Sequence, residues 1–209
     1  MDSLWALKQA IREQAVRRRL DQPDKDALSA VICGRLAALP AYRDAGAVML
    51  YVSVRSEVGT RPFLLQAIAE GKRVAIPYCV GTDLELFHFQ GMEELAASGF
   101  GLLEPRPELR ADPKRRVDPA ELDLVMVPGV AFDRRGGRLG HGKGYYDRGL
   151  PRVRRNAPLV AVAFECQLFP EIPVLERDIF MDLVITEKAI YEGRFRVRRP
   201  GETLPPTGP

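Results

Sequence analysis

Cysteine is scarce in this sequence, which has only three in 209 residues. Cys33, Cys79 and Cys166 lie far apart, form no CxxC pair and are odd in number, so neither a disulfide framework nor a zinc site is expected. Also lacking are an apolar run long enough to cross a membrane and the continuous apolar stretch of a signal peptide. We therefore expect a reducing, cytoplasmic setting, with an organellar address as the alternative because the start is amphipathic and basic.

The sequence also lacks a large excess of charge of either sign, because 31 Lys+Arg against 28 Asp+Glu leave a formal net charge of +3. So small an excess does not indicate a general surface for polyanions. An RNA-binding protein stays a distant alternative, supported by Arg194, Arg196, Arg198 and Arg199 but by no nucleic-acid motif. We expect a monomer with a small-molecule substrate, and neither a nucleic-acid nor a membrane partner.

Short apolar runs rich in β-branched residues alternate with helical patterns along the chain. Helical spacing predicts one helix after Ser3, with Leu4, Leu7, Ile11 and Ala15 on its apolar side. A second helix is predicted from Pro23 to Pro40, and a third over 61–70. Strands are predicted at 48–54, 73–76, 84–89, 122–127, 159–164 and 183–185. The first two strands and the helix between them make a βαβ unit, so we expect an α/β fold with a central, mostly parallel sheet.

The chain is long enough to bury one sizeable core, and we expect a single domain over residues 1–198. Residues 104–119 are rich in proline and charge and are predicted to form a loop. Residues 199–209 can bury almost nothing, which predicts a disordered tail.

The most informative segment is a glycine-rich run that follows the strand predicted at 122–127. Five glycines between 136 and 144 would let backbone N–H groups approach a ligand, and Arg138 and Lys143 add positive charge. We expect both cations in a flexible loop that faces solvent, beyond the carboxyl end of a strand, where open α/β sheets bind ligands. The pattern favours phosphate binding over the alternative, a flexible glycine-rich surface turn.

Residues 137–143 match GxxxxGK, the first part of a Walker A loop, but Gly144 stands where the magnesium-binding Ser or Thr would be. A metal bound to ATP would need another oxygen ligand, and Asp147 is the nearest candidate. The alternative for Asp147 is an ion pair with a nearby arginine. Lys8 and Arg12 lie four residues apart on the first helix, so they could grip one anion together or be plain solvated cations.

The run RLGHGKGYYDR at 138–148 resembles the signature of 5-formyltetrahydrofolate cyclo-ligases, also called methenyltetrahydrofolate synthetases. The resemblance extends from the first helix to about Thr186. It implies a three-layer α/β sandwich that resembles the NagB/RpiA/CoA-transferase-like fold. It also implies ATP and Mg²⁺ as cofactors and the cyclisation of 5-formyltetrahydrofolate, with or without a polyglutamate tail, to 5,10-methenyltetrahydrofolate, releasing ADP and phosphate. A non-catalytic or repurposed nucleotide- or folate-binding paralogue is the alternative.

The resemblance also implies roles for individual residues. For ATP it implies Lys8, Arg12, Arg138, Leu139, Gly140, His141, Gly142, Lys143, Gly144, Tyr145 and Tyr146. For the folate it implies Val52, Glu57, Phe100 and Tyr145, and for magnesium Asp147 and Asp182. The residues implied in catalysis are Lys143, Arg138 and Tyr145. Glu57 could instead cap a helix, and Phe100 and Tyr145 could be core aromatics.

Two positions depart from the family pattern, His141 in the loop and Arg177 where many relatives have His. In the family's reaction the formyl oxygen of the substrate attacks the γ-phosphate of ATP. The nucleophile then belongs to the substrate, so the protein supplies positioning and charge neutralisation. This agrees with a sequence in which no Ser-His-Asp or Cys-His constellation is evident.

Overall fold

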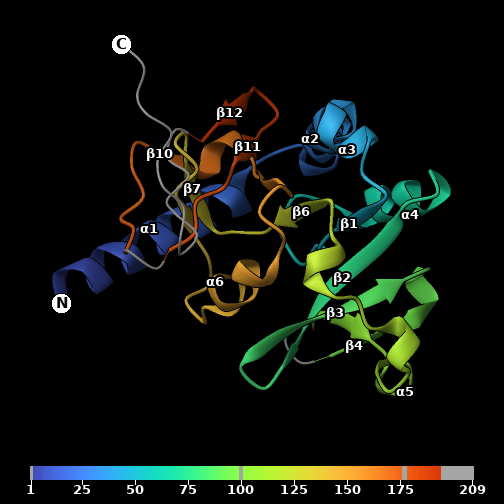
Figure 1. Cartoon of the computed structure of the whole chain (residues 1–209). Coiled ribbons are helices and arrows are strands. Elements are labelled where there is room, and N and C mark those ends of the chain that lie inside the picture. The colour runs from blue at the N-terminus through green and yellow to red at the C-terminus, as the bar shows by residue number, and fades with distance from the viewer. Residues whose placement is uncertain (1, 99–100, 176–177, 194–209) are drawn as a thin grey trace, which may run out of the picture.

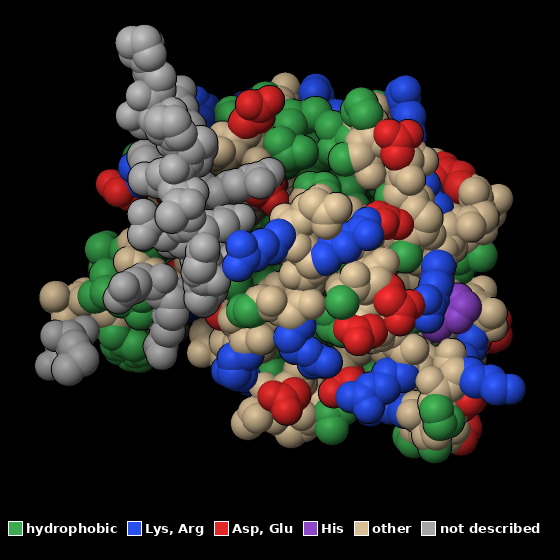
Figure 2. All heavy atoms as spheres, viewed as in Figure 1, with side chains coloured by type: hydrophobic (Ala, Val, Ile, Leu, Met, Phe, Trp, Pro, Cys, Tyr) green, Lys and Arg blue, Asp and Glu red, His purple; other side chains and the backbone are tan. Residues whose placement is uncertain are grey.

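The computed structural model describes residues 2–98, 101–175 and 178–193. Phe100, Arg177, the arginines after Gly193 and the tail predicted at 199–209 lie outside these residues, so the predictions for them stay predictions. Within the described ranges, no helix combines the length and the hydropathy that crossing a membrane requires. On the face drawn in Figure 2, Lys and Arg side chains are interspersed with Asp and Glu, as the small net charge suggests.

A seven-stranded sheet forms the centre of the molecule, in the order β12-β11-β9-β6-β1-β2-β3 (Figure 1). Its strands are β1 Ala47–Met49, β2 Arg73–Val80, β3 Asp83–Phe89, β6 Leu124–Val127, β9 Leu159–Val162, β11 Leu183–Ile185 and β12 Ile190–Glu192. Neighbours from β11 to β2 are parallel, while β3 and β12 pair antiparallel at the two edges. The mostly parallel sheet is confirmed, and all six predicted strands are present, although β1 ends earlier than predicted.

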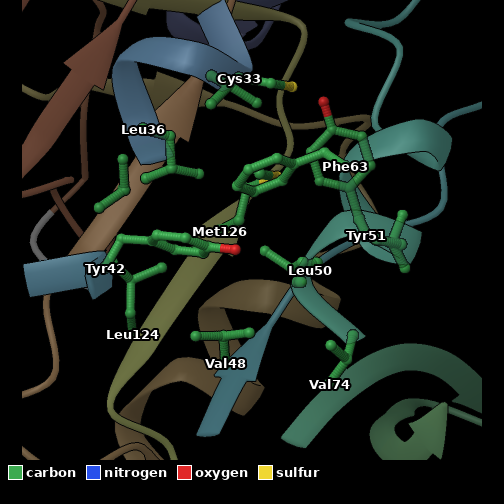
Figure 3. Close-up of a cluster of buried hydrophobic side chains, with 14 of the residues drawn as sticks. Cys33, Leu36, Tyr42, Val48, Leu50, Tyr51, Phe63, Val74, Leu124 and Met126 are labelled. Carbon is green, nitrogen blue, oxygen red and sulfur yellow. The ribbon is translucent and has the colours of Figure 1, made fainter. Parts of the chain in front are cut away.

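Three helices cover one face of this sheet: α2 Lys25–Ala38, α3 Pro40–Arg43 and α4 Arg61–Ala69. Alternate residues of the strands, such as Val48 and Met126, point to this side and join one buried cluster with Leu36, Tyr42 and Phe63 (Figure 3). The rings of Tyr42 and Phe63 lie with centroids 5.1 Å apart. Because full burial of such a side chain contributes about 1.5–3 kcal/mol, this layer makes a large contribution to folding. The predicted βαβ unit is β1, α4 and β2.

The other face carries a second, small sheet that the sequence did not predict. It contains β7 Ala131–Asp133, β8 Arg138–Leu139 and β10 Leu168–Phe169. Phe132 of β7 packs on the strand residues that point to this second face, for example Val125 and Ala161. The helix α6, Tyr145–Gly149, lies on the same side. The long helix α1, Asp2–Asp21, packs on the small sheet through Ile11 and Ala15. Leu7, expected on the apolar side of α1, is 50% exposed.

The segment predicted as a loop at 104–119 holds several short elements. The elements in and just before this segment are η1 Met92–Glu94, β4 Leu95–Ala97, β5 Leu103–Pro105, α5 Pro107–Arg110, η3 Pro113–Arg115 and η4 Pro119–Glu121. Two further short helices, η5 Leu150–Arg152 and η6 Glu165–Gln167, lie later in the chain. η3 and η4 begin at a proline, and the side chains of Asp112 and Asp118 accept the backbone N–H two residues on. These are ordinary helix starts, built from a capping acid and a proline with a preset backbone angle.

Candidate functional site

The glycine-rich segment lies at the carboxyl edge of the parallel strands. After β6 the chain forms the β7–β8 hairpin, passes through residues 140–144 and enters α6. The hydroxyl of Tyr145 donates to the carbonyl oxygen of Gly81 at 3.2 Å, and Arg148 donates to that of Thr82 at 2.6 Å. Gly81 and Thr82 form the turn that follows β2, so these contacts place the segment where the sequence predicted it.

The five glycines of this segment have two different structural roles. Gly136 and Gly137 are buried in the β7–β8 turn, where a Cβ at Gly136, whose φ is +91°, would overlap the carbonyl oxygen of Met181. The amide of Gly137 donates to the carboxylate of Asp133 at 2.9 Å. Gly140, Gly142 and Gly144 lie in the more open part that follows. The expectation that all five glycines approach a ligand is therefore wrong for the first two, which serve the packing of the hairpin. We define the glycine loop as residues 140–144.

Arg138 is buried beneath this loop, so the prediction that it faces solvent is wrong. It belongs to β8, and its side chain is 4% exposed. One guanidinium nitrogen, Nη2, donates to Oδ1 of Asp147 at 2.7 Å, and the guanidinium carbon lies 5.7 Å from the ring centroid of Tyr146. Its Nε has no hydrogen-bond partner among the described residues. The side chain of Asp147 is 32% exposed, which leaves part of its carboxylate open to the loop.

Cations of α1 face the loops at this edge, each with its own partner. Nζ of Lys8 pairs with Oδ2 of Asp178 at 2.8 Å, and Nε of Arg12 donates to the carbonyl oxygen of Gly140 at 2.8 Å. Lys8 and Arg12 thus share a helix face, as their spacing predicts, but they bind different segments of the chain. The side chain of Leu139 packs with Ile11 of α1, so only its backbone is near the glycine loop.

A second loop, which follows β1, lies near the glycine loop, because the charge of its Arg55 reaches His141. Its turn at 54–57 is closed by two bonds of 3.1 Å, from the Val54 amide to Oε2 of Glu57 and from the Glu57 amide to the Val54 carbonyl oxygen. Val52, before the turn, packs half-buried against the main core. Burial raises the pKa of Glu57, while its hydrogen bond from Val54 and the charge of Arg19 oppose that rise.

The glycine loop is surrounded by positive charge. Partial desolvation of its imidazole lowers the pKa of His141 most, although the residue as a whole is exposed, and the charges of Arg19, Arg12, Arg55 and Lys143 lower it further. Residues 141–143 are exposed. Cations gathered around an exposed glycine-rich loop form a surface suited to an anion such as a phosphate.

Tyr145 and Tyr146 are adjacent in sequence but lie in different surroundings. Tyr145 is half-buried, under the guanidinium of Arg148 at 5.4 Å from its ring centroid. The pKa of Tyr146 is raised by burial and further by the charge of Glu57, so its hydroxyl lies near the second loop. Tyr146 therefore connects the two loops, and it stays protonated at neutral pH.

Asp182 lies away from the glycine loop, so the structure does not bring it together with Asp147. It immediately precedes β11, and its Oδ2 accepts the amide of Leu159 at 2.8 Å, at the amino ends of these strands. The carboxylate that sequence reasoning missed is Asp178, which reaches Lys8. The sequence feature that could have pointed to Asp178 is the adjacent Arg177, one of the two positions that depart from the family pattern. No cluster of three or more potential metal ligands occurs within residues 2–98, 101–175 and 178–193.

The carboxylates at this edge fit a magnesium ion that binds mainly to phosphates. Such an ion uses one or two protein carboxylates and keeps the rest of its shell for substrate phosphates and water. Asp147 meets this need because it is partly exposed, next to the glycine loop and oriented by Arg138. The arrangement therefore suits an anion at the glycine loop with a divalent cation at Asp147.

Comparison with known proteins shows which family and which solved structures this chain is similar to. The family model for the 5-formyltetrahydrofolate cyclo-ligase family matches residues 4–187. A probable 5-formyltetrahydrofolate cyclo-ligase of Schizosaccharomyces pombe is 35% identical over 79% of this chain and 86% of its own, and 5-formyltetrahydrofolate cyclo-ligase of Escherichia coli is 31% identical over 84% and 97%. The NMR structure of Aquifex aeolicus 5,10-methenyltetrahydrofolate synthetase superimposes with a TM-score of 0.78 at 32% identity, over 95% of this chain and 96% of that one.

Proposed function

Because this chain belongs to the 5-formyltetrahydrofolate cyclo-ligase family, we propose that it converts 5-formyltetrahydrofolate to 5,10-methenyltetrahydrofolate with ATP, releasing ADP and phosphate. The observation that carries this proposal is the glycine loop, open and ringed by cations, at the carboxyl edge beside the partly buried Glu57. This arrangement suits a polyphosphate next to a ring-shaped second ligand. The cytoplasmic setting and the monomeric state stay predictions.

ATP binds along the glycine loop in this proposal. The backbone N–H groups of 140–144 and the exposed side chain of Lys143 take the phosphates, and Arg12 holds the loop from α1 through the carbonyl oxygen of Gly140. His141 lies among the same cations, so a bound anion would raise its pKa and favour its charged form. Arg138 acts from below, by orienting Asp147.

Magnesium supplies charge neutralisation on the phosphates when it is bound. Asp147 is the residue of this chain that we propose to hold it, with Arg138 setting the direction of its carboxylate. Asp182 is not part of this proposal, because its carboxylate binds the backbone at the other end of the strands. Lys8 is held by Asp178, so these two charges form the wall of the site near α1 rather than a first grip on the nucleotide.

The folate binds between the loop after β1 and Tyr145. The Val54 amide orients the carboxyl group of Glu57, which can then pair with ring N–H groups of the substrate. Val52 and Tyr145 add apolar contact on either side, and Phe100 keeps its expected stacking role as a prediction outside the described residues. These contacts place the formyl group towards the glycine loop.

The bond changes follow from this placement. The formyl oxygen attacks the γ-phosphorus and the bond to the bridging oxygen of ADP breaks. The neighbouring substrate nitrogen then bonds to the activated carbon and gives up its proton to solvent, and the bond from that carbon to the phosphate oxygen breaks. The formyl oxygen therefore ends in the released phosphate. No protein nucleophile takes part, and the chain contributes orientation and positive charge.

An isotope experiment tests this function. With the formyl oxygen of the substrate labelled, we expect methenyl product, ADP and phosphate in equal amounts, with the label in the phosphate. Normal product with unlabelled phosphate would overturn the direct attack. ATP binding without methenyl product would overturn the proposed function and favour a repurposed paralogue.

A further inference from the structure

Helix α1 holds three loops of the site through one stripe of cations. Lys8, Arg12 and Arg19 contact Asp178, Gly140 and Ser56 respectively. At 100° per residue, positions 8, 12 and 19 lie on one face of a helix, and the buried Ala15 between them lets the helix pack closely. The sequence pattern indicates a binding role for Lys8 and Arg12, and the structure adds Arg19 as the third cation of this stripe.

Arg19 is unusually buried for an arginine on a surface helix. The residue is 5% exposed, and its Nε donates to Oγ of Ser56, itself 8% exposed, at 3.1 Å. Arginine is seldom fully buried without a carboxylate partner, and burial of its charge costs free energy. No ion pair of Arg19 with a carboxylate occurs among the described residues within 4.0 Å, so its charge acts on the site without being neutralised directly.

The loop that carries Glu57 is held at its base by bonds between its own residues and at its tip by a bond from α1. At the base, the amide of Ser53 donates to the hydroxyl of Thr60 at 3.0 Å, and the amide of Thr60 donates to the hydroxyl of Ser53 at 3.1 Å. At the tip, residues 54–57, the bond from Arg19 joins the turn to α1. The base is therefore closed by bonds between its own residues, and Arg19 ties the tip to a helix that is distant in the sequence.

We propose that Arg19 is a positioning residue for folate binding, which fixes the tip of this loop through Ser56 and thereby aims Glu57 at the substrate. It does so without touching the substrate itself. This inference rests on the proposed function in one respect, the assignment of Glu57 to the folate. The positioning of the tip can be measured without any turnover.

Titratable side chains of three segments surround Glu57. The facing titratable groups are Tyr51 at the end of β1, Tyr146 of α6 and Arg19 of α1. Burial raises the pKa of both tyrosines, so they are neutral at working pH. Arg19 is then the charge that lowers the pKa of Glu57 against the effect of burial. Removal of that charge should raise the pKa of Glu57.

The first experiment compares amide hydrogen exchange in the parent protein, Arg19→Met, Arg19→Lys and Ser56→Ala. We expect the amide of Val54, which donates to Glu57, to exchange about tenfold faster or more in Arg19→Met and Ser56→Ala, since each loses a bond to a charged group. The amide of Thr60 at the base should change little. Arg17→Met, an exposed position on the same helix, is the matched control. Unchanged exchange at Val54 in both Arg19→Met and Ser56→Ala would overturn the proposal, whether or not the protein makes methenyl product.

The second experiment measures steady-state kinetics as a function of pH. In Arg19→Met we expect KM for the folate to rise about tenfold, KM for ATP to change little, and the acid limb of kcat/KM for the folate to move to higher pH. Arg19→Lys should restore the acid limb because it keeps the charge, and Ser56→Ala should leave that limb in place. Equal losses for ATP and folate with an unmoved acid limb would show a merely structural role. If Arg19→Met fails to fold, the KM values of Ser56→Ala decide: a rise in KM for the folate with KM for ATP little changed supports the positioning role, and equal rises for both substrates overturn it.

Discussion

The different surroundings of Arg138 and Lys143 lead to opposite expectations for two charge removals in one segment. Arg138→Met keeps the apolar stem but removes the guanidinium that holds Asp147, in a side chain that is 4% exposed. Lys143→Ala removes a side chain from the exposed part of the glycine loop. We expect the first change to lower both stability and activity, and the second to lower activity alone.

The structure sets the size of the stability effect. A hydrogen bond to a charged group contributes about 1.5–3 kcal/mol to stability. Asp147 is 32% exposed, so water can replace part of the lost contact, and Nε of Arg138 already lacks a partner among the described residues. Both facts reduce the loss, to about 1–2 kcal/mol. For a chain of this length each kcal/mol shifts Tm by about 2–4 °C, which predicts a decrease of about 2–8 °C for Arg138→Met. A surface change such as Lys143→Ala stays within about 0.5 kcal/mol.

Thermal unfolding and ATP kinetics of the two variants together check this reasoning. We expect kcat/KM for ATP to decrease about tenfold or more in Lys143→Ala, because a direct phosphate contact is lost. Arg138→Met should lose activity as well, through the misplaced Asp147. An unchanged Tm in Arg138→Met would refute the buried ion pair as a stabilising contact. Unchanged kinetics in both variants would remove this segment from the ATP site.

Three further predictions follow from the same geometry. Asp147→Asn should raise the magnesium concentration needed for half-maximal rate, and a magnesium titration that overlays that of the parent protein would place the metal elsewhere. Gly136→Ala should destabilise the fold by more than the roughly 1–3 kcal/mol that a strained φ costs alone, because a φ of +91° is combined with overlap on Met181. Gly142→Ala, at a φ of +88° in more open space, should affect ATP use more than Tm. Burial raises the pKa of Glu57 above 4.5, so its ionisation costs stability as pH rises through that range. Glu57→Gln should therefore increase Tm at neutral pH and lose this advantage below pH 4.5, and an equal Tm difference at both pH values would contradict that assignment.

Local pattern was enough to predict six of the seven strands of the central sheet, all but the edge strand β12. In β6 and β9, successive residues alternate between two buried faces, so each strand is a continuous apolar run that is easily read along the chain. The small sheet was missed because β8 and β10 have two residues each and show no period. A neighbour in space, and not the local sequence, makes such short segments into strands.

The sequence alone predicts a phosphate site at the carboxyl edge, because the run is rich in glycine and cations and directly follows β6. The sequence could not decide which of its charges meet solvent, because that depends on packing between distant segments. Arg138 is buried because the β7–β8 hairpin folds back on the sheet, Lys8 meets Asp178 across 170 residues, and Arg19 meets Ser56 across 37. Contacts over such separations leave no periodic trace, since loop closure lets any two suitably placed side chains meet at a cost that grows only slowly with length. The tertiary structure alone therefore decided that Asp147 is held from below and that α1 anchors the loop of Glu57.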